Sequence, residues 1–128
     1  MDNKIILIVE DDLHIIELLT YNLGKEGFNV IALPNGETVL ELASKIKPDL
    51  ILLDLMMPGL NGHEILHLLK RNMRLYRIPV IIISALINKE VINKSFDLKA
   101  AEYIAKPFNV KELVKIVRRV LSRETVSV

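Results

Sequence analysis

The sequence predicts an α/β domain in which helices cover both faces of a five-stranded parallel sheet. Short apolar runs typical of strands alternate with longer segments in which apolar residues recur at helical spacing. Two of the strand-like runs, at residues 5–9 and 80–83, are apolar at every position. Such strands are buried on both faces, as in a parallel sheet. With 128 residues, 51% of them hydrophobic, the chain is expected to form one domain with a sizeable core.

Strands and helices are expected in strict alternation along the chain. Five βα units in a row form a doubly wound sheet, and the flavodoxin-like strand order 2-1-3-4-5 is the leading choice. The strands are expected at residues 4–9, 29–33, 50–54, 79–84 and 102–105. Each helix carries an apolar stripe. The stripes are Leu13, Ile16, Leu19 and Leu23; Val39, Leu40, Ala43 and Ile46; Ile65, Leu66, Leu69 and Met73; Val91, Ile92, Ser95 and Phe96; and Leu113, Val114, Val117, Val120 and Leu121.

The helix ends carry signals of their own. Asp12 is expected to start the first helix, because acidic residues suit a helix N-terminus. Gly24 or Gly27 is expected to end it. Asn61 and Asn109 are each followed three residues later by a glutamate, which resembles a capping box at the start of the third and fifth helices.

The composition excludes several classes of protein. The chain contains no cysteine, which rules out disulfides and thiolate metal sites and fits a cytoplasmic protein. The formal net charge of +1 gives no electrostatic reason to expect nucleic-acid binding. No apolar run approaches the ~20 residues of a membrane helix, and the N-terminus lacks the layout of a signal peptide. His14, His63 and His67 lack the paired spacing of zinc ligands and are interpreted as surface or helix residues.

Four of the predicted strands lead into side chains that are suited to phosphate chemistry. In open α/β sheets, ligands bind beyond the carboxyl ends of the strands, at the point where the strand order reverses. The first and third strands are neighbours at that point, so their acidic residues are expected to share one crevice. The residues are Glu10, Asp11 and Asp12 after the first strand, Asp54 in the third, Ser84 in the fourth and Lys106 after the fifth.

Clustered carboxylates predict a bound cation. Two like charges ~4 Å apart repel by several kcal/mol at an effective dielectric of ~20, so the cluster must take up a proton or a cation. Oxygen ligands without histidine or cysteine favour Mg²⁺, with Mn²⁺ as the alternative. An open metal site beside a carboxylate, a hydroxyl and a lysine is equipped for phosphoryl transfer, with the carboxylate as the nucleophile.

At these residues the chain resembles the receiver domain of bacterial two-component response regulators. Four segments carry the resemblance: VEDD at 9–12, LLDLMMPGLNG at 52–62, SA at 84–85 and YIAKPF at 103–108. Each is weak alone, but together, in order and at the expected strand ends, they are highly specific. The resemblance covers residues 4 to about 121. It implies a receiver domain at 1–122, followed by a short tail or linker at 123–128.

The resemblance implies a role for each acidic residue. Asp54 would accept a phosphoryl group from a phosphohistidine on a sensor histidine kinase or phosphotransfer protein. Asp11 and Asp54 would bind Mg²⁺ together with the backbone carbonyl of Met56, and Glu10 would act through a metal-bound water. Asp12 is interpreted as a helix-start residue rather than a ligand.

The resemblance also implies how phosphorylation would be sensed. Ser84 would hydrogen-bond one phosphoryl oxygen and Lys106 would pair with another, while Tyr103 would be an aromatic switch coupled to Ser84. The Lys106-Pro107 peptide bond would be cis. The face formed by strand 79–84, strand 102–105 and the helices after them would change shape and act on an output domain or protein. Only self-phosphorylation and slow self-dephosphorylation are expected as chemistry.

The chain departs from the family pattern at two places. Lys99 stands where the family often has glycine, which puts the shape of the loop into strand 102–105 in doubt. Ile92, Ala101 and Ile116 are apolar or small where DNA-binding members often carry charges for a symmetric dimer, which lowers the expectation of that dimer. The sequence leaves open whether the domain stands alone or is a fragment.

Three alternative functions can be weighed against the residues, and each lacks a feature that it would need. A flavodoxin-like flavin carrier would need a hydroxyl-rich phosphate loop after the first strand, where Glu10 and its neighbours would repel phosphate. A haloacid-dehalogenase-type phosphatase normally has a second aspartate two residues after the first, where this chain has Met56. A degenerate receiver that only binds proteins would lack the acceptor or the lysine, and both are present here.

Overall fold

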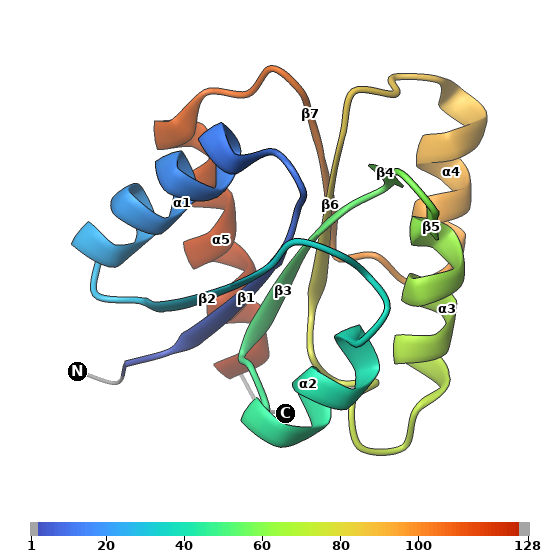
Figure 1. The fold of residues 1–128 in the computed structure, drawn as a ribbon, viewed down its shortest axis with the longest axis horizontal. Helices are drawn as coiled ribbons and strands as arrows, with labels where there is room; N and C mark the ends of the chain where they lie inside the picture. Colours follow the sequence, from blue (N-terminus) through green and yellow to red (C-terminus); the bar gives the residue numbers. More distant parts are fainter. Residues whose placement is uncertain (1–2, 126–128) are drawn as a thin grey trace.

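The computed structural model describes residues 3–125 and confirms the predicted parallel sheet. The sheet has the order β2-β1-β3-β6-β7, which is the predicted order 2-1-3-4-5 once two short strands outside the sheet are counted (Figure 1). All neighbouring strands are parallel. The strands are β1 (Ile5–Val9), β2 (Asn29–Leu33), β3 (Leu50–Asp54), β6 (Val80–Ser84) and β7 (Glu102–Ala105).

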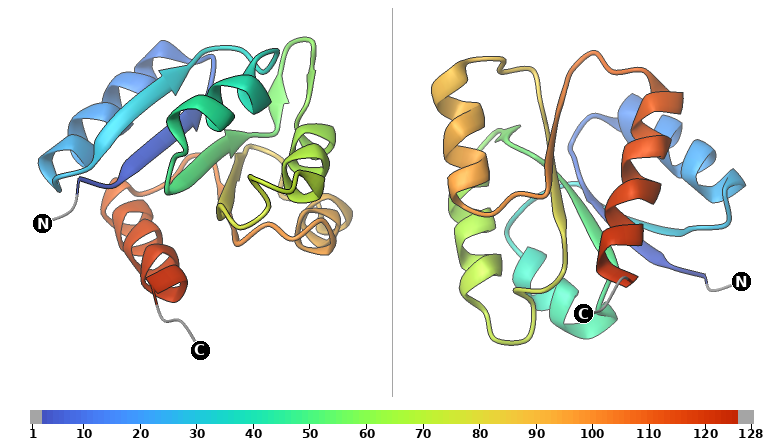
Figure 2. Two further views of the ribbon diagram at one scale, coloured as in Figure 1. Left: turned by 90° about the horizontal axis from the view of Figure 1, so that it is seen from below. Right: turned by 180° about the vertical axis from the view of Figure 1, so that it is seen from behind.

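Five helices cover the sheet, and each face has its own hydrophobic core. One core joins α1 and α5, and the other joins α2, α3 and part of α4, as the two groups of helices in Figures 1 and 2 show. The three central strands are almost fully buried, as the unbroken apolar runs predict. The helices are α1 (Leu13–Lys25), α2 (Val39–Ile46), α3 (Gly62–Arg71), α4 (Lys89–Asp97) and α5 (Val110–Thr125).

The last helix continues into the predicted tail. α5 runs through Thr125, so residues 123–125 extend the domain's final helix rather than leave it. Residues 126–128, the remainder of that tail, lie outside the described residues.

A small hairpin directly after β3 is absent from the sequence prediction. Its strands β4 (Met56–Met57) and β5 (Leu60–Asn61) pair antiparallel around Gly59, whose φ of 72° suits glycine. Strands of two residues are too short to produce a hydrophobic period. The hairpin links the carboxyl end of β3 to the start of α3 and lies beside α3 and α4 in Figure 1.

The predicted caps are present. Asp12 accepts hydrogen bonds from the backbone N–H groups of His14 and Ile15 at 2.9 and 3.4 Å, so it is the N-cap of α1. Asn61 and Asn109 each accept the N–H of the glutamate three residues later, at 3.1 Å in both cases. The described contacts thus include the asparagine half of each predicted capping box.

Three residues of the predicted apolar stripes are exposed instead of buried. Leu13 is 67% exposed in the first turn of α1, and Phe96 is 43% exposed on α4. Met73 is 90% exposed because α3 ends at Arg71, before the stripe reaches it. Periodicity predicts which face of a helix is apolar. Which residues of that face are buried depends on where the helix ends and on which elements pack against it.

Gly62 brings the start of α3 close to the backbone after β3. A Cβ atom at Gly62 would lie 2.7 Å from both Cα and Cδ2 of Leu55, closer than any normal contact. Glycine is therefore required here for packing rather than for an unusual φ. Any side chain would push α3 away from the segment that follows Asp54.

We expect Gly62→Ala to reduce the free energy of unfolding by about 1–3 kcal/mol, the usual cost of overpacking. Urea unfolding followed by circular dichroism measures this value. Gly24→Ala is the matched control, because a Cβ there meets nothing within 4 Å inside α1. That control should raise stability by up to about 1 kcal/mol, since alanine is the better helix former. Equal effects of the two substitutions would contradict the packing argument.

Lys99 adopts the left-handed conformation that glycine usually supplies. Lys99 directly follows the C-cap of α4 and has a φ of 76°. The loop therefore has a left-handed turn at this position, and the Lys99 side chain adds steric strain to it. The Lys99 and Ala100 N–H groups donate to the carbonyls of Phe96 and Ser95, which closes the helix end. The doubt about the loop shape is thereby resolved in favour of a left-handed turn.

We expect Lys99→Gly to raise the free energy of unfolding by about 1 kcal/mol, because it removes the penalty of a side chain in this conformation. Lys115→Gly in the middle of α5 is the control and should lower stability by about 1 kcal/mol. Both values come from urea unfolding. A loss of stability in Lys99→Gly would show that the side chain stabilises the loop by more than its strain.

Candidate functional site

The carboxylates predicted to share a crevice do lie together. Val9 pairs with Leu53 across β1 and β3, which places Glu10 and Asp54 at the same edge of the sheet. Ligand atoms of Glu10, Asp11 and Asp54 all lie within 4.8 Å of one another. Asp11 is exposed, whereas Glu10 and Asp54 are buried. The strand order alone brings together acids that are more than forty positions apart in the chain.

Lys106 lies between the two buried carboxylates. Its Nζ is 3.0 Å from Glu10 Oε1 and 2.9 Å from Asp54 Oδ2. Its N–H donates to the Ser84 carbonyl at 2.8 Å, and the Lys106-Pro107 bond is cis, as the family resemblance predicts. Lys106 directly follows the edge strand β7, so it reaches the crevice from the side of β3 that faces away from β1.

Burial dominates the electrostatics of the site. Glu10 is 1% exposed and Asp54 is 3% exposed. Desolvation raises the pKa of Glu10. Hydrogen-bond contributions from Lys106 and from the Asp12 N–H lower it by a smaller amount, and the charge of Asp54 adds a smaller increase. Desolvation also acts against the charge on Lys106, but its hydrogen bond to Asp54 and its close contact with the charges of Asp54 and Glu10 together outweigh that effect and raise the Lys106 pKa. Repulsion between the carboxylates, which the sequence suggested, is therefore a smaller cause of the raised Glu10 pKa than desolvation.

The donor set fits a hard divalent cation. All three ligand atoms are carboxylate oxygens, the type that Mg²⁺ and Mn²⁺ prefer. Glu10 Oε1 is buried and accepts no hydrogen bond of good geometry, although Lys106 Nζ is 3.0 Å away. The backbone N–H of Met56 donates to Asp54 Oδ1 at 2.9 Å, which orients that carboxylate. The buried Glu10 oxygen therefore lacks a full set of hydrogen bonds, and the exposed carboxylate of Asp11 lies beside it. A bound cation would compensate such a buried charge.

Ser84 and Tyr103 are linked through the backbone of Leu86, a residue that the sequence did not single out. Ser84 is fully buried, and its Oγ accepts the Leu86 N–H at 3.0 Å. The Tyr103 hydroxyl donates to the Leu86 carbonyl at 2.5 Å. One peptide segment thus contacts both predicted sensing residues. Backbone groups carry no sequence signal, so this link was visible only in the structure.

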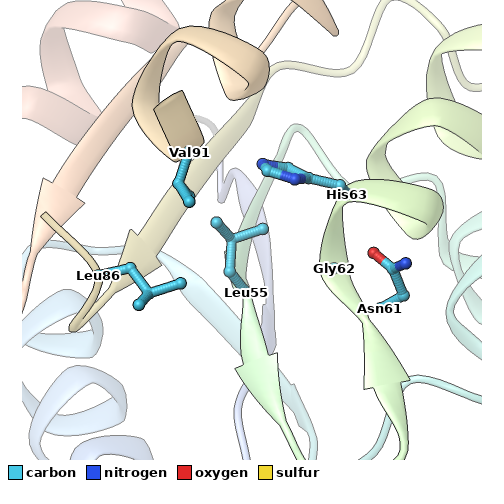
Figure 3. A pocket seen from close by; sticks show the side chains of 6 residues that line it. All are labelled: Leu55, Asn61, Gly62, His63, Leu86 and Val91. Carbon is cyan, nitrogen blue, oxygen red and sulfur yellow. The ribbon is translucent and has the colours of Figure 1, made fainter. Parts of the chain in front are cut away.

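His63 lies on α3, as the sequence interpretation of a surface or helix residue allows, and it is half-buried with a partner on another helix. Its Nε2 lies 2.9 Å from Ser95 Oγ, which joins α3 to α4. Figure 3 shows the ring beside a pocket of 310 Å³ lined by Leu55, Asn61, Gly62, His63, Leu86 and Val91. His63 and Ser95 are 32 positions apart, so no local motif could have paired them.

The family model of the response regulator receiver domain matches residues 6–118. This chain belongs to the response regulator receiver domain family. Receiver domains are phosphorylation-dependent switches of two-component signalling, and this chain is one of them. The observed sheet order, the acidic crevice and the lysine at its rim are consistent with that membership.

Known proteins support the same membership. The receiver domain is 36% identical to the alkaline phosphatase synthesis transcriptional regulatory protein PhoP of Bacillus subtilis over 98% of its length and 51% of that protein. It is 38% identical to the DNA-binding dual master transcriptional regulator RpaA of Synechocystis over 92% of its length and 49% of that protein. The chain thus spans about half the length of these relatives.

Solved structures agree with the fold. A response regulator from Chloroflexus aurantiacus is 29% identical, with a TM-score of 0.89 over 95% of this chain and 100% of that one. The Mn²⁺-bound form of response regulator Rcp1 is 30% identical, with a TM-score of 0.78 over 98% of this chain and 96% of that one. Within residues 3–125, no helix is long and apolar enough to span a membrane.

The raised pKa of Glu10 gives a pH-dependent prediction for the cation-free receiver domain. A carboxyl that binds its proton more tightly when folded favours the folded state below its ordinary pKa of 4.5. That contribution is lost as the pH rises through the folded-state pKa. We expect Glu10→Gln to be more stable than the wild type at pH 7, by on the order of 1 kcal/mol, with the difference vanishing near pH 4.5.

Urea unfolding in the presence of a chelator, at several pH values, measures this difference. Glu17→Gln on the exposed face of α1 is the control and should change stability by less than about 0.5 kcal/mol. A destabilised Glu10→Gln variant at pH 7 would mean that the ion pair with Lys106 outweighs the cost of burying the carboxylate.

Proposed function

We propose that Asp54 is the phosphoryl acceptor of this receiver domain, and that the donor is a phosphohistidine on a sensor histidine kinase or a phosphotransfer protein. One observation carries the proposal. Asp54 is a buried carboxylate of the acidic cluster that lies 2.9 Å from the ammonium group of Lys106 and stands in the segment 52–62 that resembles the family motif, which separates it from the equally buried Glu10. A nucleophile between a cation site and a lysine is what transfer of a charged phosphoryl group requires.

The metal in this proposal is Mg²⁺, with Mn²⁺ as a substitute. Asp11, Asp54 and the backbone carbonyl of Met56 would bind it, and Glu10 would hold a water of its coordination shell. When bound, the ion would neutralise charge on the phosphoryl oxygens and on the acidic cluster. The oxygen donor set of the cluster supports this assignment. The Mn²⁺-bound relative Rcp1 supports it as well.

The protein's own groups position the reaction. A carboxylate oxygen of Asp54 attacks phosphorus, a P–O bond forms, and the P–N bond to the donor imidazole breaks, which leaves a neutral or protonated histidine on the partner. The Met56 N–H holds Oδ1 of Asp54 in place. Lys106 exchanges its contact with Oδ2 for one with a phosphoryl oxygen, and its raised pKa keeps it charged for this purpose.

The proposed response runs through Leu86. When the Ser84 hydroxyl turns to a phosphoryl oxygen, it gives up the hydrogen bond that it accepts from the Leu86 N–H. The Leu86 carbonyl holds the Tyr103 hydroxyl, so a shift of this peptide segment moves the half-buried tyrosine on β7. The surface formed by β6, α4, β7 and α5 then changes and acts on an output domain or protein. Ile87, 72% exposed at the start of this surface, would supply apolar contact area.

We expect Asp54→Asn to abolish Mg²⁺-dependent labelling by acetyl phosphate, because an amide oxygen is too weak a nucleophile to form the acyl phosphate. Intact-protein mass spectrometry measures the labelled fraction. Asp97→Asn, at the exposed end of α4, is the control and should label like the wild type. Undiminished labelling of Asp54→Asn would sink the assignment. Labelling of the wild type that persists in a chelator would remove the metal from the mechanism.

A further inference from the structure

One polar pair, the half-buried His63 and the buried Ser95, links α3 to α4. The two helices share little close backbone packing. His63 at the start of α3 reaches toward α4 in Figure 3 and places its Nε2 2.9 Å from Ser95 Oγ. Ser95 is fully buried, and serine seldom occupies such a position without a partner for its hydroxyl. The pair therefore joins the start of α3 to the second half of α4.

The hydrogen bonds of Ser95 determine the form of the histidine ring. The Ser95 hydroxyl donates its one proton to the Val91 carbonyl at 2.9 Å within α4. Its oxygen must then accept from His63, so Nε2 carries a hydrogen and a neutral ring leaves Nδ1 bare. A second proton would bind at Nδ1. The bond to Ser95 would survive, but the ring would become a cation.

The surroundings of His63 disfavour that cation. Burial lowers the pKa of His63 below its ordinary value of 6.5, and the positive charge of Lys94 on α4 lowers it further, against a smaller opposing contribution from the Val91 carbonyl. The other residues around the pocket are the nonionisable Leu55, Asn61, Gly62, Leu86 and Val91. On α3 itself, the titratable neighbours in sequence are Glu64, which follows directly, and His67 one turn later. Lys94 is therefore the charge on α4 that a protonated His63 would meet.

We propose that the His63–Ser95 pair is a proton-sensitive link between α3 and α4. With a neutral ring it holds α4 against α3. When the ring is charged, His63 on α3 and Lys94 on α4 repel each other, and this repulsion loosens α4. Leu86 and Val91 share the pocket with His63, so the displacement reaches the loop that contacts Ser84 and Tyr103. This link acts in the unphosphorylated domain and does not require that Asp54 be the acceptor.

The experiment is a titration of the whole chain, without phosphodonor, from pH 7.5 to 5. Amide resonances of α4 are followed by ¹H–¹⁵N NMR, and the ring nitrogens of His63 report its tautomer and protonation. We expect a neutral ring with hydrogen on Nε2, a ring titration below pH 6.5, and α4 resonances that shift with the same midpoint. His67→Gln, one turn along the same helix, should leave this titration unchanged.

Two variants separate the link from a general acid effect. His63→Gln retains a donor for Ser95 but does not titrate, so the α4 shifts should disappear while the pair remains. Ser95→Ala retains the titrating ring beside Lys94 but removes the hydrogen bond to α4, so α4 should already be displaced at pH 7.5 while the ring still titrates. The proposal is overturned if α4 titrates equally in the wild type and His63→Gln. It is also overturned if the neutral ring carries its hydrogen on Nδ1, or if the ring stays neutral down to pH 5.

Discussion

The site depends on Lys106 being held between two buried carboxylates where β1 and β3 lie side by side. Its Nζ is within 3.0 Å of both Glu10 and Asp54. Removing acids from water is costly, and one ammonium group cannot compensate both of them fully. The crevice therefore keeps an unbalanced negative charge next to the exposed Asp11. This imbalance explains why the site is suited to a divalent cation, and why we expect the stability of the cation-free domain to change with pH.

The same lysine connects the crevice to the switch elements. Its backbone N–H is bonded to the Ser84 carbonyl, and the Ser84 hydroxyl and the Tyr103 hydroxyl both contact Leu86. Leu86 in turn lies in the pocket beside His63. In the proposed response, a charge change at Asp54 would have a short physical route to α4 and β7 through hydrogen bonds that can exchange partners.

Sequence reasoning succeeded where local chemistry carries the information. The central strands were predictable because they are apolar at every position, and Asp12, Asn61 and Asn109 because their side chains cap the helix that follows them. It failed for Met73, because the end of α3 at Arg71 has no strong local signal. The β4–β5 hairpin was missed because its strands are two residues long. The partner of His63 was missed because Ser95 is distant in the sequence and lies on another helix.

The sequence by itself determined the order of strands and helices and the residue types available for chemistry. The spacing of apolar residues, the capping residues and the acids at strand ends are properties of short segments. Each can be recognised from a few consecutive residues without knowing which other segments lie nearby. Only the tertiary structure decided how strongly Glu10 is desolvated, which oxygens Lys106 contacts, and that Leu86 and the His63–Ser95 pair connect the site to α4. Burial and through-space contacts depend on which segments become neighbours, and that depends on the packing of the whole chain.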